Sequence, residues 1–332
     1  MVETPAQRLL FISWAPFCSR SDNIARELGG RSVMIYHSFW GSNYFTVLCK
    51  YITQSVATLR VLLRERPRVV FVMTPPAIAC FPVMLYAALF RARWVIDAHS
   101  ATFNNARWRA LSFLQRFLSR RAATTIVTTP HWQELLRRWG ARSDIIQDVP
   151  IAFPEPSHLT VPAGPNIAVI CTFTFDEPIE CIFRAAAKVP EVRFHVTGNA
   201  RRVSPALLAI KPPNLELTGF LPDADYVALL IRCTAVMCLT TLDHTMQRGA
   251  YEAAYLGRPI ITSDFGLLRS AFPVATVYVS DDPESVAEGV RTMCRDAARY
   301  QREALELRAT KQERWSGVKH AVQELLSAPQ PD

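Results

Sequence analysis

The sequence predicts an α/β protein made of two doubly wound halves, each with a layer of parallel strands covered by helices. Short runs of β-branched and apolar residues alternate with longer segments of helical periodicity, which is the pattern of such a layer. The alternation is interrupted once, by a proline-rich stretch, and then starts again. A chain of 332 residues also favours two domains over one.

The first half contains six runs that are typical of strands buried on both faces. The intervals between them, such as residues 42–66 and 77–90, have helical periodicity. The interval 77–90 is the longest apolar stretch, but it is shorter than the ~20 residues that span a membrane, so we interpret it as a buried helix. The six strand runs are residues 8–13, 32–37, 68–73, 93–98, 124–129 and 144–149.

The proline-rich stretch VPIAFPEPSHLTVPAGP, residues 149–165, has no helical period and is interpreted as an interdomain linker. We therefore expect an N-terminal domain over 1–150, a linker over 151–165, a C-terminal domain over 166–310 and a helix over 311–332 that packs back across both. Two such halves leave a cleft faced by the carboxyl ends of their strands. The second set of strand runs is residues 166–173, 192–198, 215–220, 235–241, 258–264 and 276–280.

Basic residues are concentrated in one segment of the chain. There are 37 Lys and Arg against 29 Asp and Glu in all, and residues 101–142 alone contain eight Arg against one acid, Glu134. This concentration predicts an acidic partner, either nucleic acid or anionic lipid, with a solvated basic helix face as the alternative.

The eight cysteines predict no zinc site. None forms a CxxC pair, and no Cys/His spacing suits a zinc ion. The N-terminal residues MVETPAQRLLFIS lack the basic and apolar regions of a signal peptide. Together these features predict a protein of the reducing cytoplasm.

The segment LTTLDHTMQRGAYEAAYLGRPIITSD, residues 239–264, carries the strongest functional pattern. A strand ends, a polar loop follows, and a helix begins near residues 246–249. The unpaired N–H groups and positive end of such a helix suit a diphosphate. Gly249 would let the backbone approach a ligand, Arg248 would bind a phosphate, and Glu252 would accept from ribose hydroxyls. The alternative is that Glu252 only complements the helix dipole.

The sequence AYEAAYLGRPIITSD within this segment resembles a glycosyltransferase signature in which Glu-Ala-x-x-x-Gly-x-Pro precedes a strand. Upstream, VPEVRFHVTGN and NLELTGFLPDADYVALL resemble the preceding strands and helix of the same domain. By these motifs the chain resembles the GT-B-fold, nucleotide-sugar-dependent glycosyltransferases, closest to the retaining group 1 enzymes of family 4. The likeness covers residues 167–290 well and is mainly one of strand order in the N-terminal half.

The resemblance implies a GT-B fold, in which two Rossmann-like domains face a central cleft. The first domain would hold the acceptor and the second a UDP- or GDP-sugar, without an obligatory metal. Glu252 would bind the ribose, and the backbone before its helix would meet the donor sugar. The further positions assigned to the nucleotide sugar in this way are Thr174, Gly198, Asn199, Gly219, Phe220, Leu221, Thr245, Met246 and Gln247.

Two departures from the family pattern change the expected site. The family usually has a second Glu eight positions before the first, where this chain has His244 flanked by Asp243; either side chain could bond a sugar hydroxyl. The family also places an Arg and a Lys after the first strand of the second domain, but residues 171–180 contain no base. Arg248, or Arg20 in the loop APFCSRSDN of the first domain, would then neutralise the diphosphate.

The segment IDAHSATFNN, residues 96–105, places Asp97 and His99 where a strand ends. The family frequently has a His after this strand, close to the transferred sugar. His99 would therefore bond a sugar hydroxyl or stabilise developing charge, with a structural role as the alternative. A retaining reaction needs no protein nucleophile and depends on stabilising the leaving group. An inverting reaction would need Asp97 or His99 to take the proton of the acceptor.

A helix over residues 108–121 would present a basic face bordered by aromatic side chains, the pattern of a helix that lies on anionic lipid. Phenylalanines buried in the core are the alternative. Related enzymes often act on lipid-linked acceptors at the inner membrane face. The basic residues are Arg109, Arg116 and Arg120, which cluster within about 40° at 100° per residue, and the aromatic ones are Phe113 and Phe117.

We therefore expect a cytoplasmic glycosyltransferase of polysaccharide or glycoconjugate synthesis, peripheral on the inner membrane face. Its acceptor would be a glycan, a glycolipid or a small molecule. Two alternatives stay open: a sugar-nucleotide epimerase with the same fold, which needs no acceptor, and a non-catalytic nucleotide-binding module. No GxGxxG or GxxxxGK[ST] motif supports an NAD-dependent or P-loop enzyme, and a nucleic-acid partner would leave the pattern around Glu252 unexplained.

Overall fold

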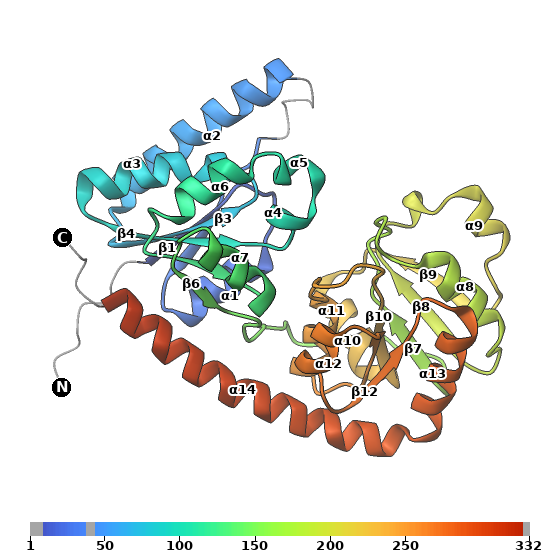
Figure 1. Cartoon of the computed structure of the whole chain (residues 1–332). Helices are drawn as coiled ribbons and strands as arrows, with labels where there is room; N and C mark the ends of the chain where they lie inside the picture. The colour runs from blue at the N-terminus through green and yellow to red at the C-terminus, as the bar shows by residue number, and fades with distance from the viewer. Residues whose placement is uncertain (1–8, 38–43, 328–332) are drawn as a thin grey trace. The chain divides into compact units, whose positions relative to one another are not determined.

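The computed structural model describes residues 9–37 and 44–327, and the chain divides into two compact units (Figure 1). Unit 1 consists of Met1–Pro150 with Trp315–Asp332, and unit 2 of Ile151–Arg314. Each unit has one six-stranded parallel sheet with helices on both faces, which confirms the predicted α/β fold with two Rossmann-like halves.

The sheet of unit 1 has the strand order β2-β1-β3-β4-β5-β6, and all its pairings are parallel. Strands β1, β3, β4 and β5 are buried along their whole length, which explains why their sequences are apolar without alternation. All six predicted runs form strands; Arg8 of the first run and residues 42–43 of the first predicted helix lie outside the described residues. The strands are β1 Leu9–Ser13, β2 Arg31–Met34, β3 Val69–Thr74, β4 Arg93–Ala98, β5 Thr124–Val127 and β6 Ser143–Ile145.

Helices cover both faces of this sheet. Figure 1 shows α2, α3 and α6 together over one face, and their side chains Leu62, Val83 and Leu118 belong to one core cluster. The other face packs against α1 and the end of the last helix, through Ile24 and Trp315. The helices are α1 Ser19–Glu27, α2 Tyr44–Glu65, η1 Ala77–Ala79, α3 Cys80–Phe90, α4 Ala101–Asn104, α5 Ala106–Arg109, α6 Ser112–Ser119 and α7 Pro130–Arg138.

The single helix predicted over residues 108–121 is wrong. Helix α5 ends at Arg109 and α6 begins at Ser112, because Leu111 leaves helical geometry with φ −99° and ψ 18°. Arg109 therefore does not share a helix face with Arg116 and Arg120, and the predicted basic stripe is split between two helices. Of the two interpretations of Phe113 and Phe117, burial in the core is also wrong, since these rings are 69% and 40% exposed.

The sheet of unit 2 has the order β12-β11-β10-β7-β8-β9, again with parallel pairings throughout. Its six strands fall in the six runs predicted for the second half. They are β7 Asn166–Val169, β8 Arg193–Thr197, β9 Leu215–Gly219, β10 Ala235–Cys238, β11 Ile260–Ser263 and β12 Thr276–Val279. The helices are α8 Ile179–Ala187, η2 Ala200–Arg202, α9 Pro205–Ala209, α10 Asp223–Arg232, α11 Arg248–Tyr255, α12 Gly266–Ala271 and α13 Pro283–Arg295.

The proline-rich stretch before β7, which we interpreted as an interdomain linker, packs against unit 2. Phe153, Leu159 and Val161 pack against the core of unit 2, and the Ser157 amide donates to the carbonyl of Ala224 at 3.1 Å. The proline-rich sequence therefore has no helix or strand of its own but lies along the surface of unit 2.

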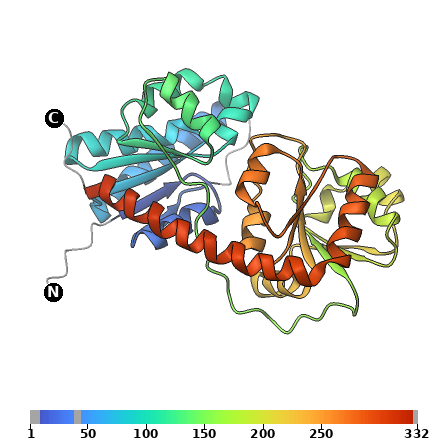
Figure 2. The ribbon, with the colours of Figure 1, turned by 60° about the horizontal axis from the view of Figure 1, so that its bottom comes forward.

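The last helix, α14 Ala297–Ser327, contributes to both units. Ala304 and Leu307 are buried in the core of unit 2, whereas Trp315, Val322 and Leu326 are buried in the core of unit 1. The indole of Trp315 also donates to Glu27 of α1 at 2.9 Å. Figure 2 shows α14 as one continuous helix. Among the described residues, no helix has the length and apolar character needed to cross a bilayer.

Candidate active site

The predicted nucleotide-sugar residues of unit 2 lie where strands end. Thr174 follows β7, Asn199 follows β8, Phe220 follows β9, and residues 243–249 follow β10. Because the sheet is parallel, these loops emerge at the same edge. The amide of Gly198 donates to the carbonyl of Gly219 at 3.1 Å, so the ends of β8 and β9 are joined directly.

Gly198 has a conformation and a position that require glycine. Its φ is +106°, and a Cβ atom there would lie 1.9 Å from the carbonyl oxygen of Cys171. The turn after β8 therefore presses against the end of β7. Asn199 then caps the short helix η2, since its side chain accepts from the Arg201 amide at 3.2 Å.

Helix α11 begins at this edge without a side-chain cap. Its N-cap residue Gln247 is extended, with φ −89° and ψ 109°, and its side chain makes no capping hydrogen bond. The first amides of a helix have no intrahelical acceptor and carry partial positive charge, so this N-terminus suits an anion. A Cβ on Gly249 would lie 2.6 Å from both Cys238 Sγ and Ile170 Cδ1. The glycine thus lets the helix pack against the ends of β10 and β7, where we had expected close approach of a ligand.

Glu252 is held by two donors one turn into α11. Glu252 is only 5% exposed. The Tyr226 hydroxyl donates to its Oε2 at 2.5 Å, and Arg248 Nε donates to its Oε1 at 2.8 Å. Burial and the charge of Glu252 raise the pKa of Tyr226 well above its usual range, so that hydroxyl keeps its proton and donates. Each carboxylate oxygen retains a second lone pair for a ligand hydroxyl.

The loop before α11 is shaped by its own polar residues. Asp243 accepts from the amide of His244 at 2.6 Å, and His244 has a left-handed backbone with φ +56°. The Thr245 hydroxyl donates to the Asp243 carbonyl at 3.4 Å. The side chains of Asp243 and His244 are about half exposed, which leaves them accessible to a sugar.

In unit 1, Asp97 is the buried centre of an ion-pair group at the carboxyl end of β4. Asp97 is fully buried. Arg20 Nη2 lies 3.0 Å from its Oδ1, and His99 Nε2 lies 3.2 Å from its Oδ2. Arg20 Nη2 also donates to the Ile146 carbonyl at 2.8 Å. The Arg20 guanidinium is thus engaged inside its own unit, and its predicted contact with a diphosphate stays a prediction.

The ion pairs fix the protonation states of this group. Burial alone would raise the pKa of Asp97, but the charge of Arg20 and the hydrogen bond and charge of His99 lower it to about 2. Burial alone would lower the pKa of His99, but the neighbouring side chains of Asp97 and Cys18 raise it to about 9. At neutral pH His99 is therefore a cationic donor that cannot accept a proton, and Asp97, with so low a pKa, is only a weak base.

Two family models match the chain in succession. Residues 17–151 match the glycosyl transferase 4-like domain, and residues 165–296 match the glycosyl transferases group 1 domain. The chain belongs to the group 1 glycosyltransferases. The two matched regions fall in unit 1 and unit 2 respectively, with the proline-rich stretch between them.

Solved structures share the GT-B fold of this glycosyltransferase. A sucrose-phosphate synthase from Thermosynechococcus elongatus matches with a TM-score of 0.70 and 15% identity over 96% of this chain and 98% of that one. HepE from Anabaena, solved with UDP and glucose, matches with a TM-score of 0.69 and 14% identity over 97% and 99%. A protein from Listeria monocytogenes that is described as a UDP-N-acetylglucosamine 2-epimerase matches with a TM-score of 0.58 and 12% identity over 90% of each chain. No curated protein matches the glycosyltransferase in sequence.

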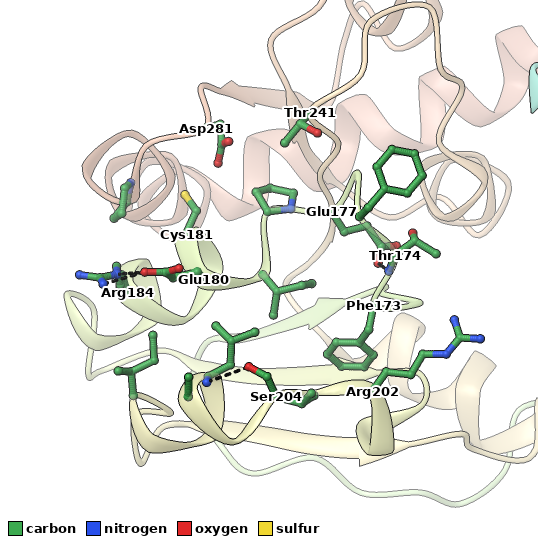
Figure 3. A pocket seen from close by; sticks show the side chains of 18 residues that line it. Phe173, Thr174, Glu177, Glu180, Cys181, Arg184, Arg202, Ser204, Thr241 and Asp281 are labelled. Carbon is green, nitrogen blue, oxygen red and sulfur yellow. Dashed lines mark hydrogen bonds and ion pairs between the residues drawn. The ribbon is translucent and has the colours of Figure 1, made fainter. Parts of the chain in front are cut away.

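A pocket of about 970 Å³ lies at the same edge of unit 2, but it is not the predicted donor site (Figure 3). Of the residues predicted to bind the nucleotide sugar, only Thr174 lines it. Figure 3 shows Glu180 paired with Arg184, and Asp281 on another wall. The lining has three acidic side chains, those of Glu177, Glu180 and Asp281, and two basic ones, those of Arg184 and Arg202. This excess of negative charge does not suit a diphosphate.

The sequence reasoning missed three residues that the structure places in these sites. Glu177 accepts from the amides of Thr172 and Thr174 at 3.0 and 2.9 Å and so closes the loop after β7; the Thr-x-x-Glu spacing was a usable capping signal. Tyr226 reaches Glu252 from 26 positions away, and Cys18 contacts His99 from another strand end, so no local pattern pointed to either.

Proposed function

We propose that this glycosyltransferase binds a nucleoside diphosphate sugar at the carboxyl edge of the unit 2 sheet and transfers the sugar to a hydroxyl acceptor. The observation that carries the proposal is the pairing of the uncapped N-terminus of α11 with the buried carboxylate of Glu252. The amides and Arg248 would bind the diphosphate, and Glu252 would accept from the ribose hydroxyls. Phe220, which is 77% exposed at the end of β9, would border the base together with Gly219 and Leu221.

The donor sugar would lie against the loop before α11. The backbone of Thr245, Met246 and Gln247 would meet it, with Asp243 and His244 within reach of its hydroxyls. The solved complex of HepE with UDP and glucose makes a UDP-sugar the first donor to test. Group 1 membership supports a reaction without an obligatory metal.

Transfer with retention fits the protonation states of unit 1 better than inversion. An inverting reaction needs a base for the acceptor proton, whereas Arg20 and His99 lower the pKa of Asp97 to about 2 and make it a weak base, and His99 is already protonated. A cationic His99 would instead stabilise negative charge as the sugar–phosphate bond breaks.

A panel of nucleotide sugars tests the proposal. We expect one UDP- or GDP-sugar to raise the melting temperature of the protein, because a ligand that binds only the folded state stabilises it. With that donor, mass spectrometry should then show a glycosylated acceptor. The epimerase alternative predicts an isomeric nucleotide sugar without any acceptor, and the non-catalytic module predicts binding with neither product. The fold does not choose between these outcomes, since a transferase and an epimerase both match it.

We also propose that unit 1 docks on an anionic membrane, which would place the enzyme at the inner membrane face beside a lipid-linked acceptor. Helices α2, α3 and α6, which share one core cluster, expose large apolar side chains outward. A groove of about 660 Å³ lies between α2 and α3 and ends at Arg121. The exposed side chains are Leu48, Ile52, Val56 and Leu63 on α2, Phe81, Leu85, Leu89 and Phe90 on α3, and Phe113 and Phe117 on α6.

The charge of this part of the chain supports anionic lipid as the partner. Residues 44–128 contain twelve Lys and Arg against two acids, and one residue of each kind, Arg93 and Asp97, is buried. Basic side chains around exposed apolar ones are typical of proteins that lie in the interface of an anionic bilayer. A nucleic acid would use the basic groups but would leave the apolar side chains without a partner.

Liposome flotation checks the membrane contact. We expect the protein to float with phosphatidylcholine vesicles that contain phosphatidylglycerol and to stay behind with phosphatidylcholine alone. Replacing Arg116 and Arg120 by Gln should weaken binding about thirtyfold, at about 1 kcal/mol for each charge. Arg295→Gln, which changes an exposed arginine at the end of α13 in unit 2, is the control and should change nothing. Equal recovery on neutral and anionic vesicles would contradict the proposal.

A further inference from the structure

Cys18 stands at the beginning of a helix beside the charged group of unit 1. It is the N-cap residue of α1, with an extended backbone at φ −151° and ψ 95°, and it is partly exposed. The positive end of a helix stabilises a thiolate at this position. The Ser21 hydroxyl, one turn into the helix, donates to its sulfur at 3.1 Å.

The thiol is the first of four groups that contact one another in a row. The Cys18 thiol interacts electrostatically with the imidazole of His99, His99 Nε2 lies 3.2 Å from Asp97 Oδ2, and Asp97 is paired with Arg20 at 3.0 Å. The amide of His99 also donates to the Thr74 carbonyl at 2.9 Å, which fixes the backbone that carries the ring. A sulfur, an imidazole and a buried carboxylate in this order are the arrangement that activates nucleophilic cysteines.

The electrostatics of the row agree with its geometry. Burial alone would raise the pKa of the Cys18 thiol, but the hydrogen bond and positive charge of His99, together with Ser21, bring it below its ordinary value. The opposite holds for the other cysteines whose pKa is shifted, since burial raises each of them. These are Cys80, Cys171, Cys181, Cys233, Cys238 and Cys294.

Cys49 provides a comparison within the same unit. It is partly exposed like Cys18, but it lies inside α2 and not at the N-terminus of a helix. Exposure alone would make Cys18 and Cys49 similarly reactive, whereas the contacts of Cys18 make it a nucleophile. The two cysteines therefore separate the effect of accessibility from that of activation.

We propose that Cys18 is a thiol-modification site, at which a small-molecule disulfide forms a mixed disulfide and thereby disables His99. The thiolate sulfur of Cys18 attacks one sulfur of the disulfide; a new S–S bond forms, the old S–S bond breaks, and the second half leaves as a thiolate. The sulfur in the adduct can no longer ionise, so His99 loses a neighbour that stabilises its positive charge and gains a bulky group beside it. Sugar transfer falls, while nucleotide binding in unit 2 is retained.

Labelling tests the site without any measurement of activity. The full-length protein is treated with one equivalent of iodoacetamide at pH 7, and peptides are analysed by mass spectrometry. We expect the label on Cys18 well ahead of Cys49, because the thiolate is the nucleophile and the helix N-terminus, Ser21 and His99 all favour it at Cys18. His99→Gln should slow the labelling of Cys18 about tenfold. Equal labelling of Cys18 and Cys49, or an unchanged rate in His99→Gln, would overturn the proposal.

Glutathione disulfide tests the consequence for transfer, and this part rests on the proposed function. We expect the wild-type protein and Cys49→Ser to lose transfer as the adduct forms, to regain it with dithiothreitol, and to bind UDP throughout. Cys18→Ser should form no adduct, and its residual activity should resist the disulfide. Inactivation of Cys18→Ser at the wild-type rate would overturn the inhibitory role, while a lack of transfer in the untreated protein would count against the proposed function alone.

Discussion

Replacing Glu252 with alanine should lower the affinity for the nucleotide sugar by about a hundredfold or more, measured by titration calorimetry. Two ribose hydroxyls that donate to an ionised acceptor contribute about 1.5–3 kcal/mol each, and 1.4 kcal/mol is a factor of ten. The carboxylate is pre-positioned by Tyr226 and Arg248, so little freedom is lost when it binds the ribose. This makes Glu252 the residue of unit 2 with the largest expected effect on binding.

The same substitution also affects folding, so it needs a matched control. It leaves the Tyr226 hydroxyl without its acceptor, at a cost of about 1–3 kcal/mol in the free energy of unfolding. Glu303→Ala removes another carboxylate of unit 2, which accepts from the Ala275 amide at 3.0 Å. It should lower the melting temperature without changing donor affinity. Tyr226→Phe, which keeps the carboxylate, should weaken binding by less than tenfold. Wild-type affinity in Glu252→Ala would show that the donor binds elsewhere.

Replacing His99 with alanine should lower turnover by about a hundredfold to a thousandfold while donor affinity changes little. Loss of one preorganised donor to developing negative charge has an effect of this size in other enzymes. His99 qualifies because its contacts with Asp97 and Cys18 keep it protonated. Steady-state kinetics and calorimetry together separate turnover from binding. A loss confined to affinity would contradict the assignment, and His320→Ala, an exposed histidine on α14, should behave as wild type.

The pH profile gives an independent check on His99. Turnover of the wild type should fall as pH rises through about 9, because the imidazolium then loses its proton. The contribution of this ion pair to stability has the same sign. It is fully present below the ordinary histidine pKa of ~6.5 and is lost as pH rises through about 9. Asp97→Asn removes the main anion beside the ring and should move the fall in turnover to lower pH.

The strands and helix α11 were predictable from the sequence because local patterns encode them. Runs such as that of β3 are buried on both faces, and the uncapped start of α11 follows a strand and a polar loop. The break at Leu111 was not predictable, because the residues around it are compatible with a helix and the backbone departs from it only at that point.

Contacts between distant residues account for the rest of what the sequence did not show. Arg20 was predicted to neutralise a diphosphate because residues 171–180 contain no base, and its pairing with Asp97, 77 positions later, could not be seen from its own loop. The roles of Tyr226 and Cys18 likewise depend on which strand ends are neighbours. The order of the strands in the sheet determines which of these residues meet. The residues next to each one in the sequence do not reveal that order.

The distribution of α14 over two cores determines where this enzyme can be divided. A fragment that stopped at Pro150 would lack Trp315, Val322 and Leu326, and its sheet would present an uncovered apolar surface to water. Chimaeras that exchange unit 1 and unit 2 between relatives therefore require two crossover points. The second crossover point lies inside α14, near Arg314. The last turns of α14 then come from the same parent protein as the first 150 residues.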